Sequence, residues 1–248
     1  MIRDLIDKDR PVGDVPLLIR VLLLVALAMQ VAWHSMQDPV MAKAEDLPHP
    51  MTPRAYTMSS FGEPIATAKI LNLWLQAFDN QPGLSIPLHS LDYGIVSEWL
   101  DTILELDPRG HYPMLVAARV YGSVSNREKQ REMMEYIFYK FNETPDKHWR
   151  WLAHAVITAK HELRDMELAL KYADALAEKA TGANVPYWAK DMKIIVLEDM
   201  GEVEAAKVLV GGLIASGEIT DPYELNFLEN KIRVLEEKLS KSQQGVDN

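Results

Sequence analysis

Four prolines divide the region from residue 108 to residue 222 into three intervals of similar length. Pro108, Pro145, Pro186 and Pro222 stand 36 to 41 residues apart, and an aromatic residue follows each within four positions. Because proline lacks a backbone N–H and has a fixed φ, it ends a helix or opens one. Each interval has room for two helices, with a polar or glycine-containing break near its middle. A period of about 34–45 residues with paired helices is typical of an α-solenoid.

Apolar residues from residue 65 onward recur at helical spacing. Two stretches show the pattern: Ile70, Leu71, Trp74, Leu75 and Phe78, and then Val96, Trp99, Leu100, Ile103 and Leu104. Residues three and four apart lie on one side of a helix, so each stretch predicts an amphipathic helix. Beyond residue 65 no segment shows sustained alternation with a period of two. We therefore expect an all-α domain over residues 65–241.

Several of these segments resemble the tetratricopeptide repeat (TPR) family. The resemblance is carried by the second-helix ending Ile103–Pro108, by the first-helix positions Met114, Ala117, Ala118 and Tyr121, and by the small pairs Ala169/Ala173 and Ala205/Ala206. It covers residues 91–222, although the intervals exceed the family's usual period of about 34 residues. The resemblance implies a TPR-like α-solenoid of about four helix pairs.

The C-terminal segment from Pro222 to Lys241 predicts one long amphipathic helix. Its apolar side holds Leu225, Leu228, Ile232, Leu235 and Leu239, and its other side is charged. A helix of this kind covers the last exposed apolar stripe of a solenoid. The alternative is a partner-binding or coiled-coil helix. Residues 242–248 are polar, and we expect a disordered tail.

The N-terminal region contains a candidate membrane span. Residues 17–33 are apolar except for Arg20 and Gln30. A span needs about 20 mainly apolar residues, so we expect a transmembrane anchor over residues 15–36. Basic residues precede this stretch at positions 3, 8 and 10. By the positive-inside rule, residues 1–14 lie in the cytoplasm and the domain lies on the opposite side, which is the periplasm in a Gram-negative bacterium.

Two alternatives to an anchor remain open. The uninterrupted apolar run covers only residues 21–29, the length of a signal-peptide core, and Ala42-Lys43-Ala44 has the form of a cleavage site. The segment also fits a buried helix of a soluble protein. Five prolines follow between residues 37 and 64, which predicts an extended linker that lies partly along the domain surface.

Composition excludes several classes of function. The chain has no cysteine, so disulfides, zinc–thiolate sites and cysteine nucleophiles are excluded. A formal net charge of −10 argues against nucleic-acid binding. His161-Glu162 resembles the start of a zinc-protease motif, but Asp165 stands where the second histidine is required. We expect no catalytic residue, no metal, no cofactor and no small-molecule substrate.

Aromatic and basic residues after the prolines are the candidate protein-binding residues. In the register implied by the TPR resemblance, Trp151 is buried, and Tyr112, Arg119 and Trp149 face the groove of the solenoid. Tryptophan and arginine are enriched at binding hot spots. His154 is expected to face the solvent or the groove. The apolar stretch from Met133 to Phe141 predicts a helix packed between two neighbours, or else a patch that docks a partner.

These observations predict a non-catalytic, single-pass membrane protein. We expect a scaffold, adaptor or assembly factor whose groove binds other proteins, themselves membrane-associated. The alternative is a permanent accessory subunit of a membrane complex. Polar Arg20 and Gln30 within the span favour packing against partner helices, which is what such a subunit requires.

Overall fold

The computed structural model describes residues 13, 15–37, 43–217 and 219–244. The chain divides into two compact units, Met1–Lys43 and Ala44–Asn248. The expected cytoplasmic segment 1–14 lies outside the described residues apart from residue 13, and the end of the expected tail, 245–248, lies outside them too. Both units are helical, as expected.

The first unit contains one helix, α1 (Leu17–Ser35), among its described residues. Its 19 residues have a mean hydropathy of 2.0, and none of them is buried. At 1.5 Å per residue the helix is about 28 Å long, close to the thickness of a bilayer's hydrocarbon core. The helix is therefore long and apolar enough to span a membrane.

The second unit consists of ten α-helices and a few short elements among the described residues. The α-helices are α2 (Pro53–Ser59), α3 (Pro64–Gln76), α4 (Tyr93–Leu106), α5 (Tyr112–Arg119), α6 (Arg127–Glu143), α7 (Pro145–His161), α8 (Met166–Lys179), α9 (Tyr187–Asp199), α10 (Val203–Ser216) and α11 (Pro222–Gln244). A two-stranded antiparallel sheet, β1 (Asn80–Gln81) and β2 (Leu84–Ser85), follows α3. Two 3₁₀ turns, η3 (Leu88–Ser90) and η4 (Tyr121–Ser123), complete the unit.

The prolines stand at helix boundaries, as their spacing predicted. Pro145 and Pro222 are the first residues of α7 and α11, and Pro186 immediately precedes α9. A proline at the first helical position loses no hydrogen bond, because the N–H there has no partner within the helix. Side chains cap other helices: the Asn126 amide oxygen accepts hydrogen bonds from the first-turn N–H groups of α6.

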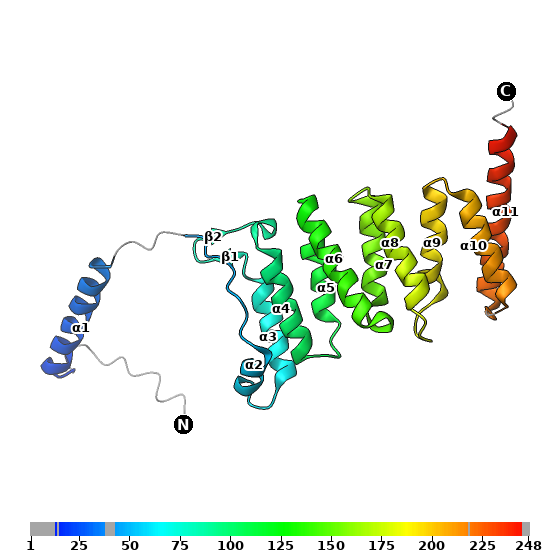
Figure 1. Ribbon diagram of the computed structural model, residues 1–248. Helices are drawn as coiled ribbons and strands as arrows, with labels where there is room; N and C mark the ends of the chain where they lie inside the picture. Colours follow the sequence, from blue (N-terminus) through cyan, green and yellow to red (C-terminus); the bar gives the residue numbers. More distant parts are fainter. Residues whose placement is uncertain (1–12, 14, 38–42, 218, 245–248) are drawn as a thin grey trace. The chain divides into compact units, whose positions relative to one another are not determined.

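The helices pack in the order of the chain (Figure 1). Each helix from α3 to α11 contacts the next, or contacts it through the intervening 3₁₀ turn, and contacts also join alternate helices such as α5 with α7 and α7 with α9. Long-range contacts are therefore made mostly between elements that are close in sequence. A hydrophobic face that no helix buries alone is covered by its neighbours on both sides.

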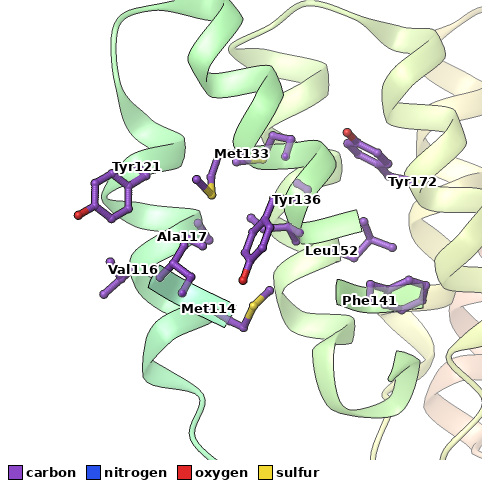
Figure 2. Close-up of a cluster of buried hydrophobic side chains, with 14 of the residues drawn as sticks. Met114, Val116, Ala117, Tyr121, Met133, Tyr136, Phe141, Leu152 and Tyr172 are labelled. Atoms are coloured by element: carbon purple, nitrogen blue, oxygen red, sulfur yellow. The ribbon is translucent and has the colours of Figure 1, made fainter. Parts of the chain in front are cut away.

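The main core runs through the centre of these helices. Figure 2 shows Met114 and Ala117 from α5, Met133 from α6 and Leu152 from α7 pointing into a shared interior. Met133, Tyr136 and Phe141 are buried, so the helix from Met133 to Phe141 packs between neighbours as predicted. Alanines on α5, α7 and α8 let the backbones approach closely, because a small side chain keeps its helix near its neighbour.

Buried tyrosines connect the first helices of the unit. The Tyr121 hydroxyl donates a hydrogen bond to the Leu75 carbonyl oxygen at 3.0 Å, and the Tyr93 hydroxyl donates one to the Tyr121 carbonyl oxygen at 2.9 Å. These two bonds join α3, α4 and η4. A buried hydroxyl needs such a partner, since an unpaired one loses its hydration without compensation.

The C-terminal helix packs its apolar side as predicted. Leu228 and Leu235 are fully buried in a smaller cluster with Ile194 and Leu197 of α9 and Val210 of α10. Lys231 and Lys238 of α11 form ion pairs with Glu198 of α9. The helix extends to Gln244, so the first residues of the expected tail are helical.

The expectation of an extended linker over 37–64 is wrong for its second half. The compact unit begins at Ala44, and residues 53–59 form α2. Pro53 opens this helix, and the Thr52 side chain accepts a hydrogen bond from the Ala55 N–H. Tyr56 and Leu47 belong to the core, and Trp99 Nε1 donates a hydrogen bond to the Pro48 carbonyl oxygen at 2.7 Å. Pro48 and Pro53 therefore belong to a segment that packs on the second unit. Positions 38–42 lie outside the described residues.

Candidate functional site

Exposed large apolar side chains gather on alternate helices of the second unit. Helices α3, α5, α7 and α9 expose Ile65, Ile70, Leu73, Trp74, Tyr112, Leu115, Ile157, Trp188 and Ile195. Among the described residues of α4, α6, α8 and α10, only Tyr139 and Val208 are large, apolar and exposed. A concentration of apolar side chains on one set of helices marks a surface suited to binding.

A hollow of about 410 Å³ lies between α3, α5 and α7, and we call it the central groove. Its lining consists of Gln76, Tyr112, Leu115, Val116, Arg119, Val120, Arg150, Trp151 and His154. The Tyr112 hydroxyl donates a hydrogen bond to Gln76 Oε1 at 3.4 Å, which connects α5 to α3 across one end. The lining combines aromatic and aliphatic surface with guanidinium, amide and imidazole groups.

A second hollow adjoins the first at Tyr112. It measures about 280 Å³ and is lined by Ala68, Lys69, Asn72, Leu73, Ile103, Asp107, Tyr112 and Pro113. Most of these residues present apolar atoms, while Lys69 supplies a positive charge and Asp107 a negative one. Because Tyr112 lines both hollows, they form one continuous surface along α3, α5 and α7.

The basic residues of this surface have no acidic partner within the described chain. Lys69, Arg119 and Arg150 are exposed, and none of them forms an ion pair among the residues that the structure describes. Lysines outside the surface are often paired: Lys140 contacts Asp101 at 3.2 Å, and Lys171 contacts Glu135 at 2.9 Å. Although the protein is acidic overall, this surface therefore carries three basic side chains and one carboxylate, that of Asp107.

Two of the three predicted binding residues line the central groove. Tyr112 and Arg119 do so, whereas Trp149 does not, because its side chain is only 3% exposed. The Trp149 ring packs edge to face on Trp188, with ring centroids 5.5 Å apart, and the Arg150 guanidinium lies 4.4 Å from its centroid. Trp151, expected to be buried, lines the groove instead.

The reason for this exchange lies in the apolar stripe of α7. Leu152, Ala153 and Val156 are buried, and Trp149 continues their stripe at the i, i+3, i+4, i+7 spacing. Trp151 falls on the other side of the helix together with Arg150 and His154. The stripe is visible in the sequence, but Trp151 also has buried residues at i+4 and i+7, Ala155 and Thr158, so packing against the neighbouring helices decides which ring is buried.

His154 faces the groove, which is one of the two positions expected from the sequence. Burial lowers the pKa of His154, and the nearby Arg119 guanidinium lowers it further. The ring is therefore neutral at pH 7. Within the described chain, His154 Nε2 and Trp151 Nε1 are buried atoms without a hydrogen-bond partner. Both atoms are covered by neighbouring protein atoms, so they are not accessible to a bound segment in this conformation.

Titratable groups outside the groove do not form a metal site in the described parts of the chain. No group of three histidine, aspartate or glutamate residues there is arranged to hold an ion. Asp191 and Glu224 face each other between α9 and α11, and burial raises the pKa of Asp191 to about 8. The two carboxyl groups lie 33 residues apart in the sequence, so no local pattern marks them as a pair.

Comparison with known proteins adds no relative to this description. No family model, no curated protein and no solved structure matches the chain.

Proposed function

We propose that this protein is a non-catalytic, membrane-anchored scaffold with a TPR-like fold, acting as an adaptor or assembly factor for membrane or envelope protein complexes. In this proposal α3/α4, α5/α6, α7/α8 and α9/α10 are four helix pairs of a solenoid, and α11 caps it. Helix α1 is the single membrane anchor. The N-terminus is cytoplasmic and the second unit is extracytoplasmic, or periplasmic in a Gram-negative host.

The observation that carries the proposal is the composition of the surface along α3, α5 and α7. Tyr112, Leu115 and Trp151 offer apolar contact, and Arg119 and Arg150 offer guanidinium groups that form no ion pair with the described part of the chain. Charge-assisted hydrogen bonds to carboxylates are among the strongest polar contacts that proteins make. The partner that fits is therefore a polypeptide segment that combines apolar side chains with aspartate or glutamate.

Purification of the full-length chain in mild detergent tests this proposal. Partners retained by the native chain are identified by mass spectrometry and compared with those of an Arg119→Glu/Arg150→Glu double variant. Reversing two charges at the groove is expected to weaken partner binding by more than about tenfold, because attraction becomes repulsion. Arg109→Glu, which changes an exposed arginine in the α4–α5 loop, is the matched control. Equal partner recovery with all three proteins would contradict the proposed groove.

A permanent accessory subunit is the second candidate. Arg20 and Gln30 lie within α1, and polar groups in a spanning helix are stabilised by partner helices. This alternative predicts membrane subunits at fixed stoichiometry through gel filtration, and it predicts that Gln30→Leu loosens the complex while the charge reversals at the groove do not. An adaptor predicts substoichiometric partners and the opposite response.

A further inference from the structure

The turn between α2 and α3 presents a phenylalanine in an unfavourable backbone conformation. The Glu63 N–H donates a hydrogen bond to the Ser60 carbonyl oxygen at 3.0 Å, and the two residues between them, Phe61 and Gly62, have φ angles of 50° and 90°. Positive φ at both central positions is the pattern of a type I′ turn, which favours asparagine, aspartate or glycine at the first of them. A phenylalanine there is strained.

Among the residues that the structure describes, the strained side chain has no packing partner. Phe61 is 99% exposed and Met58, on the last turn of α2, is 86% exposed. Ile65, on the first turn of α3, is half exposed. We call these three residues the Phe61 tip. Strain and exposed apolar surface both cost free energy, so their combination at one turn points to an external contact.

The base of this turn is firmly held. Tyr56 is buried, with its ring centroid 6.1 Å from that of Trp99, and Ser60 is buried as well. The Ser60 hydroxyl donates a hydrogen bond to the Thr57 carbonyl oxygen at 2.7 Å. The exposed side chains therefore project from a packed support.

We propose that the Phe61 tip inserts into the interface of the membrane in which α1 is anchored. This inference rests on the anchoring part of the proposed function. A convex tip of three side chains is far smaller than the roughly 800 Å² that each partner buries in a typical protein interface, whereas a bilayer accepts a single apolar projection. The charged residues that flank the tip in the sequence are Arg54, Glu63 and Lys69, and Asp107 lies beside Lys69, so these charges balance and insertion relies on the apolar side chains.

The length of the connecting chain permits this contact. Between Ser35, the last residue of α1, and Ala44, the first of the second unit, an extended chain reaches about 30 Å. Glu45, next to Ala44, is hydrogen-bonded to Gln81, which follows the C-terminal end of α3, whereas the tip lies at the N-terminal end of this helix, which is about 20 Å long. The connection is therefore long enough for the tip to reach the bilayer surface.

Site-directed spin labelling of the full-length chain tests the inference. Because the protein has no cysteine, Met58→Cys gives a single labelling site with Phe61 left in place. The chain is reconstituted into phosphatidylcholine/phosphatidylglycerol vesicles, and collisions of the label with oxygen and with a water-soluble nickel chelate are compared. Contact with lipid raises oxygen accessibility and lowers nickel accessibility several-fold. Val208→Cys, an exposed apolar position on α10, is the control expected to remain in water.

A second variant separates lipid insertion from a merely buried label. Adding Phe61→Asn to Met58→Cys suits the turn but removes its largest apolar group, so nickel accessibility is expected to rise several-fold. A label equally accessible to nickel at positions 58 and 208 would overturn the inference while leaving the anchor intact. A label shielded from both reagents would also overturn it, in favour of contact with a second copy. A chain that fails to float with the vesicles would overturn the anchor itself.

Discussion

The buried carboxyl group of Asp191 on α9 interacts with the carboxyl group of Glu224 on α11, which helps to raise the pKa of Asp191. Two neighbouring carboxylates repel each other and have no donor between them, so one of the two groups favours its protonated form. Burial and then Glu224 raise the pKa of Asp191 from its ordinary 3.8 to about 8, while Lys190 acts in the opposite direction. This pair makes the attachment of the C-terminal helix sensitive to pH.

The first prediction concerns the stability of this attachment in base. The native state holds a proton that the unfolded state has lost, so the free energy of unfolding falls as pH rises from about 4 to about 8. Asp191→Asn keeps a donor toward Glu224 without a titrating proton. We expect it to raise the melting temperature at pH 8 and to flatten the pH dependence in thermal unfolding between pH 5 and 9. Glu229→Gln, an exposed position on α11, serves as the control. A variant destabilised equally at every pH would contradict this account.

The second prediction concerns acid. His148, at the start of α7, is buried, and burial followed by Lys147 lowers its pKa from 6.5 to about 4. The unfolded chain therefore binds a proton at a higher pH than the native protein does. As a result, the free energy of unfolding decreases as pH falls from 6.5 toward 4. His148→Gln should remove up to about 3 kcal/mol of this loss, measured by urea unfolding at pH 7 and pH 4.5. The exposed His161→Gln should leave the difference between the two pH values unchanged.

The third prediction separates the two tryptophans of α7. Trp149→Ala removes a buried ring and should lower stability by about 3–5 kcal/mol. Trp151→Ala removes a half-buried ring that lines the central groove, so it should weaken partner recovery with a much smaller loss of stability. Urea unfolding and detergent pull-down of both variants check this. Equal effects of the two changes in both measurements would refute the assignment of the groove.

The fourth prediction concerns two glycines. A Cβ at Gly122 would clash with Met134 Cε and lie 3.0 Å from the Ala117 carbonyl oxygen, whereas a Cβ at Gly212 of α10 has no described neighbour within 4 Å. Gly122→Ala should destabilise the protein by about 1–3 kcal/mol through overpacking. Gly212→Ala should stabilise it by about 0.5–1 kcal/mol, because alanine favours the helix. Opposite shifts in melting temperature check both statements, and a neutral Gly122→Ala would show that Met134 moves aside.

Local patterns were enough to predict much of the architecture. The prolines at 145, 186 and 222 marked helix starts, and the apolar side of the last helix was the side it buries. The length and hydropathy of α1 were also predictable from the sequence. These features depend on residues a few positions apart, which a single helix or proline ring constrains by itself.

Other features depend on which neighbour meets which side of a helix. Helix α7 carries tryptophans on two sides, and packing against adjacent helices decided that Trp149 is buried and Trp151 lines the groove. Helix α2 lies inside the segment that was expected to be a linker, and its Tyr56 ring packs against the ring of Trp99 on α4. The facing of Asp191 and Glu224, 33 residues apart, required α9 and α11 to be brought together. The periodicity of the sequence alone determines a helix and its apolar stripe. Burial of a particular side chain also depends on the surface of the neighbouring helix that packs against it, and only the tertiary structure determines which surface that is.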